Sequence, residues 1–251
     1  MNPNVNLSVN NRIGTIEFFH PKSNALPGDL LLQLTEAIIE AGERDDIRVV
    51  ILKSSGNRAF CAGASFDELI KIEDISEGKA FFSGFSNVIN AARKCPKFII
   101  GRVQGKTVGG GVGLVSATDY CFATQFALVK LSELAIGIGP FVVGPAIERK
   151  IGMSAFSQLT INATGWQTAQ WAKEKNLFAE IYDTVEEMDL AIEALVEKLA
   201  YFNPDSMREL KEIMWDGTDH WDELLMERAK ISGKRVLSDF TLKTIAKLKK
   251  S

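Results

Sequence analysis

The sequence has few histidines and cysteines. Its two histidines, His20 and His220, lie far apart in polar stretches, which argues against a histidine metal site or a catalytic triad. Its three cysteines, Cys61, Cys95 and Cys121, show no CxxC spacing and their number is odd. We therefore expect reduced, mostly buried thiols in a cytoplasmic protein, with no metal ion bound.

The sequence also lacks excess charge and long apolar runs. Its 251 residues carry a net charge of −3 without a basic block, so no nucleic-acid partner is expected. No apolar run reaches the roughly 18 residues of a membrane span. The polar start MNPNVNLSVNN contains no apolar signal-peptide region. Because phosphate-binding and dinucleotide-binding fingerprints are absent as well, we expect neither membrane association nor a bound nucleotide cofactor.

The first half of the chain alternates between strand and helix patterns. Strands are predicted at 5–10, 13–18, 49–53, 98–103, 119–124 and 127–131, and helices at 30–41 and 78–93. Asn10-Asn11-Arg12 predicts a hairpin turn, and Asp29 is predicted to cap the first helix. From Gly144 onward nearly every segment has a helical pattern, and Asn203 and Pro204 are expected to start one of these helices. The alternation predicts an α/β fold of ββα or βαβ units, followed by a helical region.

We divide the chain into a core at residues 1–195 and a helical C-terminal region at residues 196–251. The last helices contain large apolar side chains that we expect to be exposed on the single chain, namely Trp215, Trp221, Leu224, Leu225 and Met226. Two interpretations remain open. The region packs either on another subunit, which makes it an oligomerisation region, or on its own chain.

Two glycine-containing loops each follow a predicted buried strand and precede a helix. The first is AFCAGASF at 59–66, and the second contains the triplet Gly109–Gly111. Glycines let the backbone approach a bound group closely, and a helix N-terminus offers free N–H donors and partial positive charge. If both strands lie in one sheet, one N–H from each loop points at the same oxygen. The pattern favours a two-donor oxyanion hole for a thioester enolate, although a crossover that needs glycine only for packing is the alternative.

Taken together, these segments resemble the crotonase superfamily, which includes enoyl-CoA hydratases and isomerases. RAFCAGASFDEL resembles its first oxyanion loop, VQGKTVGGGVGLVSATDYCFAT its second, LSELAIGIGP its catalytic-glutamate segment, and SNAL (23–26) its early motif. Order and spacing match over roughly residues 5–180. The resemblance implies a spiral of ββα units and a helical C-terminal region that assembles homotrimers or dimers of trimers. It also implies an acyl-CoA substrate and no cofactor beyond the coenzyme A that this substrate carries.

The resemblance assigns roles to individual positions. It places the oxyanion donors at the N–H groups of Ala64 and Gly110, and the catalytic carboxylate at Glu133. Coenzyme A contacts are expected at Ala62, Ala64, Ser65, Phe66, Asp67 and Gly110, with Lys22 near the nucleotide end. Gly113 and Phe141 are expected to line the acyl pocket. The apolar and glycine residues after Glu133 independently predict a pKa raised by desolvation; a helix-capping or salt-bridged glutamate is the alternative.

Two departures from the family's hydratase pattern bear on the reaction. Gly113 stands where hydratases usually carry a second glutamate, and Phe141 and Val142 replace part of a glycine-rich turn. Hydration needs one group that takes a proton and one that gives it, so Asp67 or Glu68 would have to supply the missing acid. We therefore predict isomerase-like proton transfer by a single glutamate, with hydratase next and acyl-CoA decarboxylase third. The alternative from another class is a non-catalytic coenzyme A-binding relative; some superfamily members bind RNA, which a net charge of −3 disfavours here.

Overall fold

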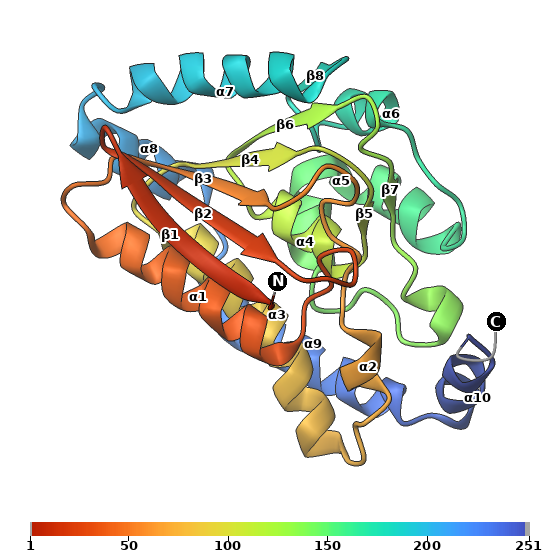
Figure 1. The fold of residues 1–251 in the computed structure, drawn as a ribbon. Helices are drawn as coiled ribbons and strands as arrows, with labels where there is room; N and C mark the ends of the chain where they lie inside the picture. Colours follow the sequence, from red (N-terminus) through yellow and green to blue (C-terminus); the bar gives the residue numbers. More distant parts are fainter. Residues whose placement is uncertain (1, 249–251) are drawn as a thin grey trace.

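The computed structural model describes residues 2–248, which form a mostly parallel sheet with helices on both faces (Figure 1). The strands of this sheet are β1 (Asn4–Asn10), β2 (Ile13–Phe19), β3 (Val49–Ser54), β4 (Ile99–Val103), β6 (Tyr120–Thr124) and β8 (Glu180–Tyr182). Their spatial order is β1-β2-β3-β4-β6-β8, and only the β1–β2 pair is antiparallel. Two short strands, β5 (Thr107–Val108) and β7 (Val129–Lys130), form a separate parallel pair.

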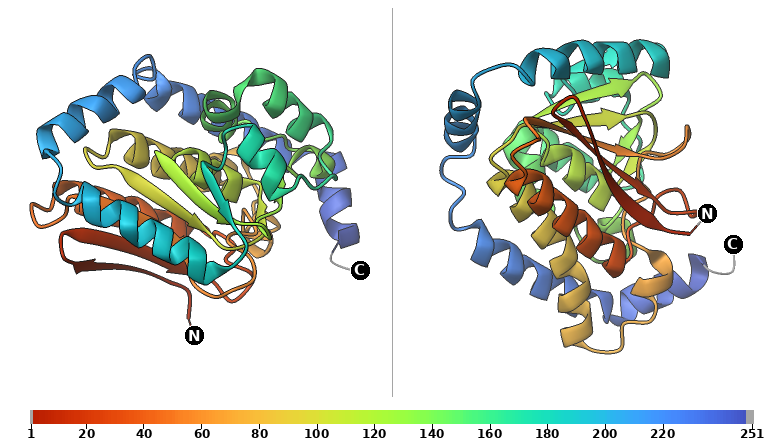
Figure 2. Two further views of the ribbon diagram at one scale, coloured as in Figure 1. Left: turned by 90° about the horizontal axis from the view of Figure 1, so that it is seen from above. Right: turned by 60° about the vertical axis from the view of Figure 1, so that its left-hand side comes forward.

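Most of the helices lie on one face of the sheet, and α7 (Val185–Leu199) covers the other (Figure 2). The helices are α1 (Gly28–Glu43), α2 (Phe66–Leu69), α3 (Ile75–Lys94), α4 (Gly110–Ser116), α5 (Gly144–Ile161), α6 (Ala169–Glu174), α7, α8 (Pro204–Met214), α9 (Trp221–Val236) and α10 (Asp239–Leu248). A 3-10 helix, η1, covers Leu134–Ile136. The larger hydrophobic core lies under α1, α3, α4 and α9, and a smaller one lies under α7. Within residues 2–248, none of the helices combines the length and the apolarity that crossing a bilayer requires.

Several local predictions are confirmed by the backbone. Asn11 and Arg12 turn the β1–β2 hairpin with φ angles of 49° and 68°. Asn203 caps α8 by accepting a hydrogen bond from the Ser206 N–H, and Pro204 occupies the first helical turn. A proline costs nothing there because its missing N–H has no intrahelical acceptor. The cysteines are free and buried, as expected.

Three predicted features differ from the structure. Helix α1 begins at Gly28, so Asp29 lies in its first turn and is not the cap. The strand expected at 127–131 is reduced to β7, which pairs with β5 and not with the main sheet. The helical half contains strand β8, which extends the parallel sheet beside β6. Because β8 is only 3 residues long, it shows no alternation that marks it in the sequence.

The C-terminal helices pack on their own chain. Trp221 and Leu225 are buried in the main core, and Trp215, Leu224 and Met226 are partly buried. The expectation that these five side chains are exposed is therefore wrong. Other large apolar side chains around α8 are exposed, namely Tyr201, Phe202, Leu210, Ile213 and Met214. The boundary drawn at residue 195 lies inside α7, and assembly through residues 196–251 stays a prediction.

Asp119 connects α8 to the sheet through hydrogen bonds and a buried ion pair. Its Oδ2 accepts hydrogen bonds from the Ile99 N–H (2.7 Å) and from Lys211 Nζ (2.8 Å), and its Oδ1 accepts one from Trp215 Nε1 (2.9 Å). The Lys211 and Asp119 side chains are only 2% and 4% exposed. A buried ion pair with its remaining groups hydrogen-bonded specifies a position, whereas loss of one partner leaves an uncompensated buried charge. This contact fixes how the C-terminal helices cross the core.

Candidate functional site

The first glycine loop is held by the SNAL segment, residues 23–26. Backbone hydrogen bonds join the two segments, namely Ala62 N to Ser23 O (3.0 Å), Leu26 N to Gly63 O (2.8 Å) and Ser65 N to Leu26 O (3.1 Å). In an extended segment, successive backbone groups point to opposite sides. The N–H of Ala64 is consequently turned away from SNAL, and within residues 2–248 it donates to no other group.

Asn24 braces the base of this loop. Its side-chain nitrogen donates to Ser55 O and Ala59 O, both at 3.0 Å, and its Oδ1 accepts from the His20 N–H at 3.0 Å. The residue is 4% exposed and adopts a φ of 56°, which asparagine tolerates better than most side chains. The asparagine of SNAL thus fixes the path of the chain between β3 and the first loop.

The second glycine loop turns from β5 into α4. Gly109 adopts φ 52° and ψ −117°, a conformation that favours glycine, and its N–H donates to Lys130 O at 2.9 Å. Gly110 begins α4, and its N–H has no acceptor within residues 2–248. A Cβ atom on Gly63 would lie 2.8 Å from Val108 O and 3.5 Å from Gly110 N, so the two loops are in contact.

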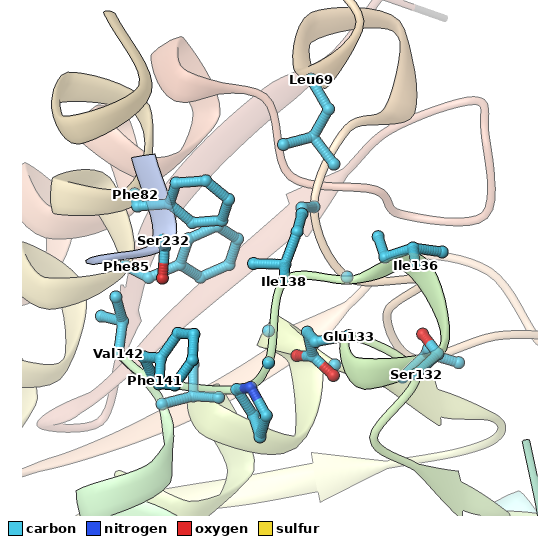
Figure 3. A pocket seen from close by; sticks show the side chains of 18 of the residues that line it. Leu69, Phe82, Phe85, Ser132, Glu133, Ile136, Ile138, Phe141, Val142 and Ser232 are labelled. Carbon is cyan, nitrogen blue, oxygen red and sulfur yellow. The ribbon is translucent and has the colours of Figure 1, made fainter. Parts of the chain in front are cut away.

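A narrow pocket of about 60 Å³ opens where the two loops meet (Figure 3). Six of the predicted site residues line it, namely Ala62, Ala64, Phe66, Gly110, Glu133 and Phe141. Most of the remaining lining side chains are apolar, including Leu69, Phe82, Phe85, Ile138, Val142 and Val143, and the others include Ser132 and Ser232. Glu133 is the one ionisable side chain among these lining residues. The free N–H groups of Ala64 and Gly110 therefore share a pocket with a single carboxyl group.

Glu133 directs its carboxyl group into this pocket (Figure 3). A Cβ atom on Gly109 would lie 2.8 Å from Glu133 Oε1, so the carboxyl group sits directly against the glycine triplet. Its Oε2 is enclosed and has no hydrogen-bond partner within residues 2–248. Desolvation raises the pKa of Glu133 to about 7, against a weaker lowering by a backbone hydrogen bond. Among the described residues, Glu133 neither caps η1 through its side chain nor forms an ion pair, so the helix-capping and salt-bridge alternatives are not supported.

Gly113 is not among the pocket-lining residues, contrary to expectation. A Cβ atom on Gly113 would lie 2.4 Å from Val143 Cγ1, so Val143 covers this glycine and faces the pocket in its place. Phe141 does line the pocket, with its ring against Gly139. The resemblance points to position 113 for a second carboxylate. The apolar side chain of Val143 fills the space beside that position.

Three predicted coenzyme A contacts, Lys22, Ser65 and Asp67, lie outside the pocket lining. Lys22 and Asp67 form an ion pair at the surface, and the hydrogen bond from Lys22 lowers the pKa of Asp67. Ser65 is buried within the first loop, where it is the residue that precedes α2. Glu68 Oε2 accepts a hydrogen bond from the Gly28 N–H (2.7 Å) at the start of α1. Neither Asp67 nor Glu68 is placed to act as a second acid in this pocket.

Sequence reasoning missed several lining residues. Phe82 and Phe85 of α3 are buried in the hydrophobic core and also form a wall of the pocket. A Cβ atom on Gly110 would lie 2.2 Å from Phe85 Cε1, so this ring presses against the second loop. The helical spacing of Phe82 and Phe85 in the sequence indicates a buried face of α3, but it does not indicate which segments that face contacts. Ser232 comes from α9, far along the chain, and no local pattern marks it.

Comparison with known proteins gives consistent matches. The family described as enoyl-CoA hydratase/isomerase matches residues 8–236. Bacillaene synthase dehydratase PksH of Bacillus subtilis is 29% identical over 208 residues, covering 82% of this chain and 77% of the relative. The putative enoyl-CoA hydratase/isomerase YngF of the same organism is 30% identical over 207 residues, covering 80% and 77%. An enoyl-CoA hydratase structure from Bacillus halodurans has a TM-score of 0.89 at 18% identity and covers 97% of this chain and 99% of that one. The structural match confirms the predicted fold.

Proposed function

The chain belongs to the enoyl-CoA hydratase/isomerase family of acyl-CoA enzymes, and we propose that it moves a proton along an enoyl-CoA by isomerase chemistry. The observation that carries the proposal is one pocket, lined mostly by apolar side chains, that combines an enclosed carboxyl group with two backbone N–H groups that have no acceptor within residues 2–248. A single base that later acts as an acid suffices for this reaction.

In this mechanism the thioester oxygen accepts hydrogen bonds from the N–H groups of Ala64 and Gly110. The Glu133 carboxylate takes a proton from the α-carbon of a 3-enoyl-CoA, and the electron pair of the broken C–H bond delocalises onto the thioester oxygen. The resulting dienolate is stabilised by the two donors, which are already oriented for it. Glu133 then returns the proton to the γ-carbon, which gives the 2-enoyl-CoA and restores the carboxylate. A pKa of about 7 suits a group that must take and give a proton near neutral pH.

The proposed function is tested by offering the purified protein a panel of short acyl-CoA substrates. We expect conversion of 3-enoyl-CoA to 2-enoyl-CoA, followed by chromatography, to exceed both hydration of 2-enoyl-CoA and loss of carbon dioxide from a malonyl-type thioester. Hydration as the fastest reaction would overturn the isomerase assignment and leave the family in place. Binding of coenzyme A without turnover of any member of the panel would make the protein a non-catalytic relative.

The position of Val143 leads to a prediction about hydration. Gly113→Glu alone is expected to destabilise the fold by about 1–3 kcal/mol, because the new side chain overlaps Val143. Gly113→Glu combined with Val143→Gly opens a path to the pocket and supplies the second acid. We expect this double variant to hydrate crotonyl-CoA at least ~10-fold faster than Val143→Gly alone, since a placed acid or base contributes ~100-fold or more. A folded double variant that hydrates no faster than its single-variant control would show that the missing carboxylate is not what limits hydration.

We further propose that the enzyme needs no cofactor beyond the coenzyme A of its substrate, with Lys22 and Asp67 contacting the nucleotide end. The exposed apolar side chains around α8 favour assembly as a homotrimer or a dimer of trimers. The net charge of −3 gives no support for a nucleic-acid partner, and we propose a cytoplasmic location.

A further inference from the structure

Ser232 places a hydroxyl group at the end of the pocket remote from Glu133. Figure 3 shows it beside Phe82 and Phe85, with Glu133 and Ser132 at the other end. Ser232 is 1% exposed and is the pocket-lining residue that α9 supplies. The other buried positions of α9 that face the main core are apolar, such as Leu225, Ala229 and Val236. A polar side chain is therefore unexpected among the buried, core-facing positions of α9.

The crossing of α9 and α3 fixes the position of this serine. A Cβ atom on Gly78 of α3 would lie 2.7 Å from the Cα atom of Gly233, and one on Gly233 would lie 2.5 Å from Lys79 N. Two glycines thus let the backbones touch at the residue next to Ser232. An alanine at position 232 would satisfy the crowding of this crossing equally well, so helix packing alone does not account for the hydroxyl group.

The hydroxyl group of Ser232 is only weakly engaged within the protein. It donates to the Arg228 carbonyl, four residues earlier, at 3.2 Å. The same intrahelical bond is 2.7 Å for Ser83 and 2.8 Å for Thr35 and Ser116, which is the usual O–H···O distance. Ser232 Oγ also retains its acceptor capacity, because a hydroxyl group can accept as well as donate. A polar group bound in the pocket can therefore form a hydrogen bond with Ser232 Oγ at little energetic cost.

We propose, on the basis of the proposed acyl-CoA function, that Ser232 is a specificity-determining residue that hydrogen-bonds a hydroxyl or keto oxygen near the distal end of a short acyl chain. If the thioester oxygen lies at Ala64 and Gly110 and the α-carbon at Glu133, the distal carbons extend between Phe82, Phe85 and Phe141 toward Ser232. A cavity of about 60 Å³ admits only a short chain. A distal carboxylate is disfavoured because none of the lining side chains carries a positive charge to compensate it.

The test uses two five-carbon 3-enoyl-CoA substrates that differ only in a hydroxyl group on the last carbon. The measured quantity is the ratio of their kcat/KM values, hydroxylated over unsubstituted. Ser232→Ala is expected to lower this ratio about ten-fold, mainly through KM, because the substrate hydroxyl is then buried without a partner. Ser83→Ala is the matched control: it removes the same kind of intrahelical bond from α3 at a residue outside the pocket lining. This control is expected to leave the ratio unchanged.

Each outcome separates the inference from the function on which it rests. An unchanged ratio in Ser232→Ala, or an equal fall in Ser83→Ala, overturns the role of Ser232 while turnover of the unsubstituted substrate upholds the proposed function. Turnover of neither substrate by the wild-type protein overturns the proposed function, and the inference with it. Preference of the wild-type protein for an otherwise equal substrate with a terminal carboxylate would also overturn the inference.

Discussion

Replacing Glu133 by glutamine is expected to lower kcat for the isomerisation at least ~100-fold, since a placed acid–base group contributes that much or more. The amide has nearly the same shape as the carboxyl group but neither accepts nor releases a proton at neutral pH. The wild-type carboxyl group makes no ion pair, and its Oε2 has no partner within the described residues, so the substitution breaks no network that holds the fold. Thermal unfolding should therefore show a folded variant, and the loss should appear in steady-state turnover.

Glu133→Asp is the companion variant. It keeps an ionisable group but withdraws it by one methylene, so we expect turnover between that of wild type and Glu133→Gln. Unchanged turnover in Glu133→Gln would remove this residue from the mechanism, whatever its pKa. A loss accompanied by unfolding in both variants would instead point to a structural role.

The pH profile provides a second readout of the same group. Burial raises the pKa of Glu133 from 4.5 to about 7, and only the ionised form can accept the substrate proton. The wild-type kcat/KM should accordingly rise with pH through a midpoint near 7, because this parameter reports groups of the free enzyme. A midpoint near the ordinary glutamate value of 4.5 would contradict the burial argument. The residual activity of Glu133→Gln should lack this rise.

The two loops could be located from the sequence because their glycines mark them, whereas the family resemblance assigned Glu133 to the same site. The glycines mark places where a side chain would collide: a Cβ atom on Gly111 would lie 2.7 Å from the Cβ atom of Cys61 in the first loop. Glu133 lies between a short strand and a run of apolar and glycine residues, so its desolvation could be predicted without coordinates. The structure confirms that these local features face one pocket.

The remaining features depend on which distant segments meet. That Val143 fills the space beside Gly113 follows from the contact of α4 with α5, which no motif encodes. Ser232 reaches the pocket because Gly78 and Gly233 bring two helices into contact across more than half of the chain. Trp221 carries an apolar side chain that suits either a subunit interface or an internal core, and only the packing of α9 on α3 decides between them. Such pairings are tertiary properties, and local patterns do not determine them.

Gly110→Ala is expected to lower kcat by ~100–1,000-fold, the usual cost of losing one oxyanion donor. The added methyl group would lie 2.2 Å from Phe85 Cε1 and 2.8 Å from its Cζ, so either the ring or the start of α4 must move. Because α4 begins at this residue, its displacement turns the N–H group away from the thioester oxygen. Affinity for coenzyme A itself, which lacks that oxygen, should change much less than kcat, as titration calorimetry would show.

The double variant Gly110→Ala/Phe85→Ala distinguishes a displaced donor from a blocked pocket. Removing the ring gives the new methyl group room, so α4 can start in its original place and kcat should recover relative to Gly110→Ala alone. Phe85→Ala is the control for the wider pocket, whose main cost should appear in KM. If Gly110→Ala keeps nearly wild-type kcat while folded, the amide of this residue does not stabilise the transition state. The mechanism would then have to rely on Glu133 and the Ala64 N–H alone.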